Sequence, residues 1–334
     1  MSTSSSFRLY SAAECMKAVP DSTGVELMGL AGCITKHVGV LQSQFGGRVE
    51  RALDQPEALL FGHMGFVPGL GTCVKSGMQV NDNARMGLDR VQASVTLFSA
   101  QTGEPRAVLD GGAVTVLRTA GALIAGVRSV LTIADPVVAV IGYGAQGRQV
   151  ARLAGSVLGA SEVRIWAPSR PSVNDGEVLA ESKAAALQGA DVVACCTSSR
   201  SPVVELGELE ASGAGESTII ASINSFAPDH SEIAPDIVAA SRLVITDIDE
   251  VDSFGPVHGA GSLAGNPQFL RLGTDVLGEY TEDFGRMTGP KTVLIGGAGT
   301  QDALMAWAIV DGEAAVIEAV SRLAGDACDR AGAD

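Results

Sequence analysis

The chain has 334 residues, of which 46% are hydrophobic and 18% are charged, and its formal net charge is −15. This length supports one large or two ordinary domains, and the acidic balance argues against a nucleic-acid partner, which would require a basic surface. No apolar run reaches the ~18 residues of a membrane helix, and the first residues lack the charged and apolar regions of a secretory signal. We therefore expect a cytoplasmic protein that binds no membrane.

The six cysteines and four histidines show no metal-binding or disulfide pattern, because the sequence contains neither a CxxC pair nor an HExxH motif. Cys195 and Cys196 stand together in a strand-like segment. We expect reduced cysteines in a buried core, and we predict no metal site.

In the first part of the chain, the hydrophobic pattern predicts a half-buried sheet followed by a buried helix. Residues 72–80 form a predicted strand, and Val91–Leu97 alternates apolar with polar residues. A turn cluster at 101–105 leads into a second apolar run, Ala107–Leu109, so a β-hairpin is expected. Small and apolar residues over 114–131 then predict a buried helix.

From Val137 onward, strands alternate with helices, which predicts a parallel doubly wound sheet of Rossmann type. The predicted strands span 137–142, 162–167, 191–197, 217–223, 242–247 and 292–297. Helices are predicted over 146–159 and, with strong amphipathic character, over 300–325. We infer an α/β protein of two domains: a mixed α+β substrate-binding domain of residues 1–130, completed by the C-terminal helix within 301–334, and a Rossmann NAD(P)-binding domain of residues 131–300.

The first of these strands leads into the glycine-rich loop "GYGAQG", which opens the predicted helix. Gly142 permits a tight turn, Gly144 lets the backbone approach a pyrophosphate, and Gly147 permits close packing of the helix on the strand. The unpaired N–H groups of the helix N-terminus then face the phosphates. We predict that a dinucleotide is bound here, by Gly142, Tyr143, Gly144, Ala145, Gln146 and Gly147. A glycine-rich turn that only packs is the alternative.

The end of the second strand bears on the choice of cofactor. An acidic residue there would bind the ribose 2′-hydroxyl of NAD and repel the 2′-phosphate of NADP. This chain has Ala167 instead, followed by Ser169 and Arg170, which can bind a phosphate. NADP(H) is therefore favoured over NAD(H). The alternative is that Arg170 is an ordinary solvated loop charge.

Two longer blocks, "VKSGMQVNDNARMGLDRVQASVTLFSAQTGEPRAVLDGGAVTVLRTAGAL" and "VVAVIGYGAQGRQVA", resemble the ornithine cyclodeaminase/mu-crystallin family. The shared pattern is a lysine, an asparagine eight positions on, a TG-x-P hairpin, and LDG and LRTA motifs before the glycine-rich loop. The matching residues here are Lys75, Asn83, Thr102–Pro105, Leu109–Gly111 and Leu117–Ala120. The later blocks "CCTSSRSPVV", "SFAPDHSEI" and "GAGTQDALMAWA" are also similar to the family.

The resemblance implies a homodimer that acts on amino acids or their imines with NAD(P), and in which arginines and a lysine hold the substrate carboxylate. Lys75 and Arg118 match these residues by motif, and they are the candidate catalytic residues. Arg48 is the better match for a further arginine, with Arg51 as the alternative. Cations on a strand and in an apolar helix are costly without partners, so a structural ion pair, for example with Asp110, is the other possible role.

Three further positions match family blocks near the expected cofactor site. Asp302 matches an aspartate at the start of the last helix, where it would lie near the nicotinamide or stabilise the helix N-terminus. Thr197 and Ser198 follow a predicted parallel strand at the end where ligands collect. Loop capping is the alternative role for this pair.

The chain also departs from the family. Phe226 stands where the cyclodeaminases have an aspartate that handles the substrate amine, and Asp229 comes three residues later. Ser99 replaces an aspartate before the hairpin turn, and residues 171–180 leave room for little more than a loop where a helix and strand are usual. We therefore expect an NAD(P)H-dependent reductase of imino acids or ketimines, in reverse an amino-acid dehydrogenase. A cyclodeaminase that recycles NAD and a crystallin-like binding protein without turnover are the alternatives.

Overall fold

A computed structural model describes residues 7–44, 48–53, 58–213, 217–261, 267–276 and 282–331 of the chain. The chain divides into two compact units. Unit 1 comprises Met1–Arg118 and Ala298–Asp334, and unit 2 comprises Thr119–Gly297. The first boundary therefore lies inside helix α3 (Gly111–Arg128) rather than after residue 130.

Unit 1 is built on a mixed sheet that, within the described residues, has six strands in the order β1-β6-β5-β4-β3-β2. Their bounds are β1 Arg8–Tyr10, β2 Arg48–Leu53, β3 Ala58–Val67, β4 Gly71–Val80, β5 Val91–Ser99 and β6 Pro105–Asp110. β1 runs parallel to β6, and the other neighbouring pairs are antiparallel. The predicted strand over 72–80 and the predicted hairpin are confirmed as β4 and as β5 with β6.

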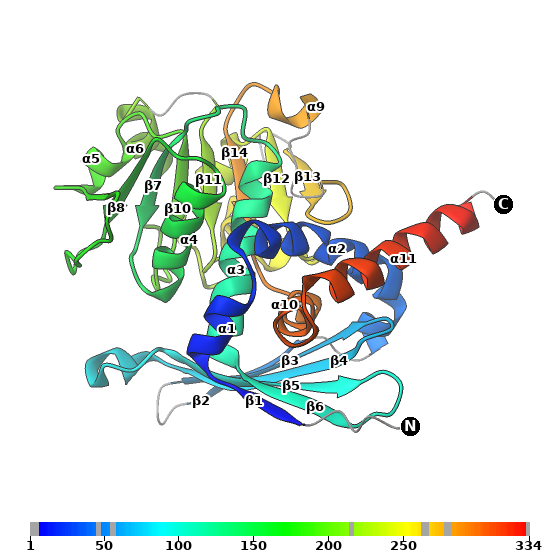
Figure 1. Ribbon diagram of the computed structural model, residues 1–334. Helices are drawn as coiled ribbons and strands as arrows, with labels where there is room; N and C mark the ends of the chain where they lie inside the picture. Colours follow the sequence, from blue (N-terminus) through cyan, green and yellow to red (C-terminus); the bar gives the residue numbers. More distant parts are fainter. Residues whose placement is uncertain are drawn as a thin grey trace. The chain divides into compact units, whose positions relative to one another are not determined.

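Helices cover one face of this sheet (Figure 1). They are α1 Ala12–Ala18, α2 Asp21–Gln44, α10 Gly299–Asp311 and α11 Glu313–Ala331, and a short 3₁₀ helix, η1, spans Asn81–Met86. α10 packs on β3, β4 and β5 and is buried along almost its whole length. The inward-facing side chains of these strands, such as Cys73, Val95 and Leu97, are therefore fully buried.

The single amphipathic helix predicted over 300–325 is wrong. Gly312, whose φ is +88°, ends α10, and α11 begins at Glu313 and continues past Gly325 to Ala331. A residue with a side chain rarely adopts this positive φ, so glycine permits the turn that ends α10 here. Beyond its polar first turn, α10 is enclosed by the sheet, α2 and α11, so residues 303–309 are apolar on all sides.

α10 lies directly against β3 where two glycines meet. A Cβ atom on Gly65 would lie 2.0 Å from the carbonyl oxygen of Gly299. A Cβ atom on Gly299 would lie 1.9 Å from the carbonyl oxygen of Met64. Both positions therefore require glycine, because any side chain would collide with backbone that cannot rotate away. This contact sets the depth at which the first turn of α10 lies over β3.

Unit 2 contains a parallel sheet that, in the described part of the chain, has eight strands in the order β13-β12-β14-β11-β10-β7-β8-β9. The strands are β7 Val137–Ile141, β8 Glu162–Trp166, β9 Glu177–Leu179, β10 Val192–Cys195, β11 Ile219–Ser222, β12 Leu243–Thr246, β13 Gln268–Arg271 and β14 Lys291–Leu294. The helices are α4 Ala145–Ser156, α5 Lys183–Leu187, α6 Leu206–Ala211, α7 Pro235–Ala240, α8 Gly255–Ala260, α9 Glu282–Gly285 and the 3₁₀ turn η2 Val251–Ser253.

The strand order of unit 2 confirms the predicted α/β fold with a doubly wound sheet. From β7 the chain adds β8 and β9 on one side and β10 and β11 on the other, so the order reverses between β7 and β10. Ligands in such sheets bind outside the carboxyl ends of the strands at this reversal. The glycine-rich loop follows β7 directly.

One expectation for unit 2 needs correction. Residues 171–180 are more than a loop, because Glu177–Leu179 form β9, which pairs in parallel with β8. A strand of three residues lacks the alternation that would identify it from sequence. The buried helix predicted over 114–131 is confirmed as α3, and its Gly126 packs so closely that a Cβ atom would lie 2.7 Å from Val293 on β14.

We predict that Gly65→Ala lowers the stability of unit 1, by about 2 kcal/mol, because the new methyl group collides with the backbone of Gly299. Thermal unfolding followed by circular dichroism measures the effect. Gly155→Ala is the matched control, since no atom lies within 4 Å of its Cβ position in α4, and it should be neutral or stabilising. Equal melting temperatures for the wild type and Gly65→Ala would contradict the prediction.

Candidate active site

Unit 1 holds a buried cluster of ionisable side chains centred on Asp302, in the first turns of α10, whose side chain is fully buried. Its Oδ1 accepts a hydrogen bond from Nζ of Lys75 on β4 at 2.8 Å. The same oxygen lies 3.2 Å from Nε of Arg118 on α3. Lys75 also donates to Thr115 Oγ1 at 3.3 Å, and Nη1 of Arg118 donates to Gln301 Oε1 at 3.3 Å. One carboxylate therefore holds both predicted substrate-binding cations.

The second oxygen of Asp302 binds a histidine that the sequence did not single out. Nδ1 of His63 on β3 lies 3.1 Å from Oδ2 of Asp302. His63 and Lys75 are directly opposite each other in the β3–β4 register, and both are buried. Nε2 of His63 is also buried and has no hydrogen-bond partner among the described residues. His63 is marked by its position opposite Lys75 on the neighbouring strand. A single sequence does not reveal which residues of two strands pair, so His63 could not be identified from it.

Burial and mutual charge shift the ionisation of this cluster. Burial opposes ionisation of Asp302, but the positive charges of Lys75 and Arg118 outweigh it and hold the pKa of Asp302 well below its usual range. Burial lowers the pKa of Lys75 to about 8, although Asp302 partly offsets this effect. Burial also lowers the pKa of His63. At neutral pH the cluster therefore holds two cations, one carboxylate and a neutral imidazole, and carries an excess positive charge.

The partner of Arg118 differs from the one proposed for a structural ion pair. Asp110 instead accepts a hydrogen bond from the backbone N–H of Ala113 at 2.8 Å, which caps the start of α3. Nε of Arg118 lies within ion-pair distance of Asp302 but makes no hydrogen bond among the described residues. Asp302 thus combines with cations of unit 1, and its expected place beside a nicotinamide remains a prediction.

Arg48, the remaining predicted carboxylate ligand, begins β2, and its backbone pairs with His63. Arg48, His63 and Lys75 therefore occupy one row across three adjacent strands. The side chain of Arg48 lies outside the described residues. Arg51, the alternative, is exposed.

In unit 2, the glycine-rich loop has the local geometry of a phosphate-binding turn. Gly142 has a φ of +97°, and a Cβ atom there would lie 2.6 Å from the carbonyl oxygen of Cys196. A Cβ atom on Gly147 would lie 2.1 Å from the carbonyl oxygen of Gly142, so the third glycine permits α4 to approach the strand. Gly144, the N-cap of α4, has open space around its Cβ position and provides no side-chain cap. The start of α4 thus has the form of the helix N-termini that bind anions in dinucleotide sites.

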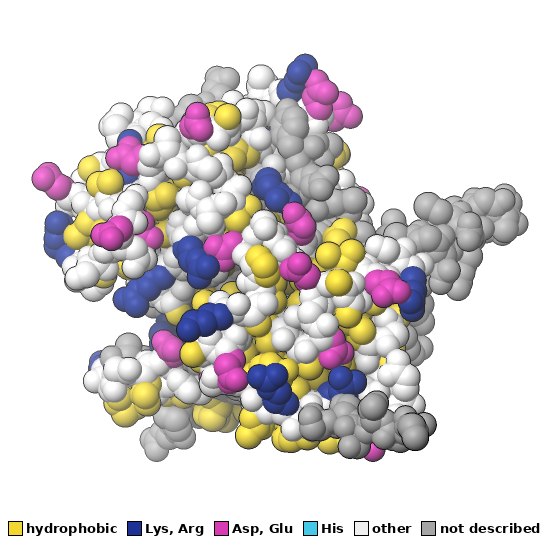
Figure 2. Space-filling model, in the orientation of Figure 1, with side chains coloured by type: hydrophobic (Ala, Val, Ile, Leu, Met, Phe, Trp, Pro, Cys, Tyr) yellow, Lys and Arg dark blue, Asp and Glu magenta, His cyan; other side chains and the backbone are white. Residues whose placement is uncertain are grey.

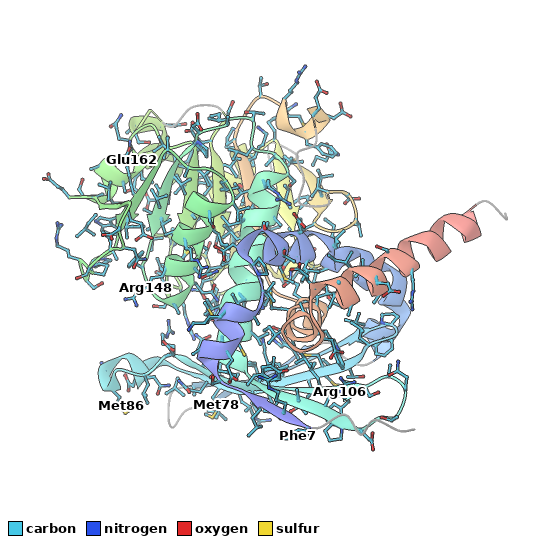
Figure 3. The ribbon with its side chains drawn as sticks, viewed as in Figure 1. Phe7, Met78, Met86, Arg106, Arg148 and Glu162 are labelled. Carbon is cyan, nitrogen blue, oxygen red and sulfur yellow. The ribbon has the colours of Figure 1, made fainter. Side chains whose placement is uncertain are left out.

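The side chain of Tyr143 ties this loop to the segment before β9. Its hydroxyl donates to Glu177 and accepts from Nδ2 of Asn174 at 2.9 Å. The guanidinium of Arg148 lies 5.4 Å from the centre of the Tyr143 ring, and Figure 3 labels this arginine on α4. Glu177 is a carboxylate near the loop that the sequence did not single out. Both of its oxygens are engaged by Tyr143 and Asn174.

The segment after β8 contains the residues proposed for cofactor choice. Ala167 is buried, whereas Ser169 and Arg170 are exposed. Arg170 has a φ of +46°, which is unusual for a residue with a side chain. Its Nη1 donates to the backbone oxygen of Glu181 at 3.2 Å. This hydrogen bond connects Arg170 to the backbone just after β9.

Thr197 and Ser198 follow β10, and Thr197 belongs to a network around a buried glutamate. Its backbone N–H and Oγ1 donate to Oε1 of Glu232 at 2.5 and 2.7 Å. Oε2 of Glu232 accepts from Ser222 Oγ and from the backbone N–H of Asn224. Burial raises the pKa of Glu232 to about 7, although these hydrogen bonds oppose the shift. The geometry of Thr197 thus matches loop capping, while Ser198 is exposed.

The segment that departs from the cyclodeaminases contains no buried aspartate at residues 226–229. Phe226 stacks on the ring of His230, with ring centres 5.0 Å apart. Asp229 is 69% exposed and pairs with His230 at 2.9 Å and with Arg200 at 3.6 Å. Within the described ranges, no group of three or more His, Cys, Asp or Glu residues could hold a metal ion. In the same ranges, no helix has the length and hydropathy to cross a membrane.

Comparison with known proteins relates the chain to imine reductases. It is 29% identical over 197 residues to the Δ1-pyrroline-2-carboxylate/Δ1-piperideine-2-carboxylate reductase of Azospirillum brasilense, and this alignment covers 54% of this chain and 58% of that protein. The chain therefore aligns with little more than half of that relative. It is 28% identical over 276 residues to the iminosuccinate reductase of Paracoccus denitrificans, covering 79% of this chain and 84% of that protein.

Solved structures share the fold. The Δ1-pyrroline-2-carboxylate reductase of Thermococcus litoralis, solved with NADH and L-proline, has a TM-score of 0.73 at 20% identity and covers 91% of this chain and 96% of its own. An archaeal alanine dehydrogenase dimer with bound NAD has a TM-score of 0.71 at 19% identity, with 92% and 96% covered. The sequence profile of one family matches residues 69–314, which is well over half of the chain. The chain belongs to the ornithine cyclodeaminase/mu-crystallin family.

Proposed function

We propose that this protein is an NAD(P)H-dependent reductase of imino acids, cyclic ketimines included, and in reverse an amino-acid dehydrogenase. The observation that supports this most is the buried excess positive charge of Lys75 and Arg118 against the single carboxylate of Asp302. A substrate carboxylate would neutralise that charge, and a buried cation needs such a partner. Relatives named as pyrroline-2-carboxylate and iminosuccinate reductases act on carbon–nitrogen double bonds beside a carboxylate.

In the proposed reaction, the cations orient the substrate. Arg118 would bind the carboxylate through its guanidinium, whose Nε has no hydrogen-bond partner among the described residues. Lys75 would donate a second hydrogen bond to the same carboxylate or deliver a proton. Fixing the carboxylate in this way aligns the adjacent C=N carbon and so removes rotational freedom before the reaction.

The residues of the glycine-rich loop fit a dinucleotide, because Gly144 leaves open space and, as the N-cap of α4, supplies no side-chain cap. When bound, NAD(P)H supplies the hydride for the reduction. Gly142–Gly147 would hold its pyrophosphate. A cyclodeaminase is less well supported, because Phe226 replaces the family aspartate and Asp229 is exposed and paired.

We predict that Arg118→Ala lowers kcat/KM for Δ1-pyrroline-2-carboxylate or iminosuccinate at least ~100-fold, or about 2.7 kcal/mol, because the carboxylate loses its main partner. NADPH affinity should change little, since the proposed pyrophosphate site is the glycine-rich loop of unit 2 and Arg118 belongs to unit 1. Arg118→Lys should restore only part of the activity, because an ammonium group cannot bind a carboxylate in bidentate fashion. Steady-state kinetics and cofactor titration measure both quantities.

The control for this substitution is Arg322→Ala, which removes another ion-paired arginine of unit 1, one that is exposed and paired with Glu318. It should leave kcat/KM unchanged. If Arg118→Ala lowers the melting temperature and weakens NADPH binding in proportion to its loss of turnover, Arg118 has a structural role instead.

We predict that carboxylate binding weakens as the pH rises above about 8, because the pKa of Lys75 lies at about 8 and its positive charge is lost as the pH passes through that value. The probe is pyrrole-2-carboxylate, whose own charge is constant at these pH values, titrated into the enzyme between neutral and alkaline pH. Lys75→Arg should remove this dependence, because arginine stays protonated. A dissociation constant for the wild type that does not change with pH would exclude Lys75 from carboxylate binding.

We propose further that NADP(H) is the preferred cofactor. Ala167 offers no carboxylate to repel a 2′-phosphate, and Arg170 is exposed beside it. Fluorescence titration should give a dissociation constant for NADPH about tenfold lower than for NADH, or ~1.4 kcal/mol, and Arg170→Ala should narrow this difference. Arg286→Ala, at an exposed arginine paired with Glu282, should leave it unchanged. Equal affinities of the wild type for both cofactors would disprove the preference.

We also propose a homodimer formed through the helix-free face of the six-stranded sheet. Exposed apolar residues, among them Phe7, Leu9, Leu60 and Met64, are found on unit 1. Figure 2 shows hydrophobic side chains along this side of the sheet, and Figure 3 shows Phe7 and Met78 there. Light scattering should give the mass of two chains, and Leu60→Glu should reduce it towards that of one. A monomeric wild type would refute the proposal.

A further inference from the structure

Within the Asp302 cluster, His63 has one engaged and one unengaged ring nitrogen. Its Nδ1 lies 3.1 Å from Oδ2 of Asp302, whereas its buried Nε2 has no hydrogen-bond partner among the described residues. The side chain is only 6% exposed. The contact of Nδ1 with Asp302 places the ring in the same buried cluster as Lys75 and Arg118, the proposed carboxylate ligands.

The partner of Nδ1 decides which ring nitrogen carries the hydrogen. Asp302 is ionised and can only accept, so Nδ1 must be the protonated nitrogen. Three charged groups face the ring from the elements around it: Asp302 on α10, Lys75 on β4 and Arg118 on α3. Burial lowers the pKa of His63; the contact with Asp302 opposes this effect only in part, and the two cations add to it. At neutral pH the ring is therefore neutral, and Nε2 presents a lone pair.

We propose that Nε2 of His63 accepts a hydrogen bond from the nitrogen-bound hydrogen of the substrate, and that His63 thereby selects a protonated imine over an oxygen analogue of the same shape. This inference rests on the proposed imine reductase function. A buried acceptor without a partner favours a ligand that brings a donor at that position. The carbonyl oxygen of a 2-oxo acid has only lone pairs to offer, so it would face Nε2 unfavourably.

The role assigned to His63 requires no net proton transfer from its ring. In the reduction, the protonated imine carries its N–H throughout while a hydride from NAD(P)H forms the new C–H bond. The π electrons of the C=N bond become the lone pair of the amine nitrogen, which takes a proton from solvent on release. His63 thus acts by binding and orienting the nitrogen, and Asp302 acts as a positioning residue that holds the ring.

Two substitutions test the roles of the two ring nitrogens of His63 independently. In His63→Asn the side-chain amide lies at the level of Nδ1, so it can still donate to Asp302 but presents nothing at the position of Nε2. In His63→Gln the amide reaches the level of Nε2, so an acceptor oxygen is restored there while the bond to Asp302 is lost. His258→Leu removes an exposed histidine of unit 2 and is the matched control.

The experiment compares two five-membered-ring carboxylates that differ at the ring heteroatom, namely L-proline, which has N–H donors, and (S)-tetrahydrofuran-2-carboxylate, which has an acceptor oxygen. Calorimetry measures both dissociation constants on the full-length protein saturated with NADP+. The wild type and His258→Leu should prefer L-proline by at least about tenfold. His63→Asn should lose most of this preference at an unchanged melting temperature, and His63→Gln should recover part of it.

Each other outcome is decisive. If His63→Asn retains the wild-type preference while Arg118→Ala weakens both ligands, the role of His63 is overturned and the proposed function stands. If His63→Asn and His63→Gln lower the melting temperature and weaken both ligands equally, His63 has only a structural role. If the wild type binds neither ligand and does not oxidise NADPH in the presence of Δ1-pyrroline-2-carboxylate or iminosuccinate, the proposed function fails and this inference fails with it.

Discussion

The carboxylate of Asp302 is the interaction on which the proposed site depends. It is fully buried, and its two oxygens together contact Lys75, Arg118 and His63. Two cations would not remain buried side by side without it, since an unpaired buried charge costs several kcal/mol, about 3–5 when one partner of a pair is removed. The carboxylate stabilises both cations, and it leaves enough positive charge for a second carboxylate from outside the protein.

The geometry of this charged cluster depends on a close backbone contact as well as on the side chains. Asp302 reaches β3 and β4 because α10 lies against the sheet at the depth that Gly65 and Gly299 allow. A helix raised by one methyl group would separate the carboxylate from Lys75. The glycine pair, which carries no chemical group of its own, is thus a condition for the charged cluster.

Much of this organisation could be predicted from the sequence, because strong local patterns carried it. The alternating residues of β5, the glycine-rich loop and the family motifs around Lys75 and Arg118 were all recognisable. The partner of these cations was not, because Asp302 lies more than 180 residues further along the chain and only the packing of α10 joins them. His63 was missed for the same reason, since its importance comes from strand register. The break at Gly312 was hidden because the apolar residues 303–310 continue without a visible change of pattern into the amphipathic α11.

The composition of unit 1 from two separated segments has a consequence for how the protein is made. Lys75 and Arg118 leave the ribosome early, whereas Asp302 belongs to the final segment, Ala298–Asp334, after the whole of unit 2. Until that segment is synthesised, the sheet lacks both α10, which covers its apolar face, and the carboxylate that neutralises its cations. Unit 2, whose sequence is continuous, can fold during translation, while unit 1 must wait until Ala298–Asp334 has been synthesised. The second segment of unit 1 therefore controls when the proposed substrate site can first form.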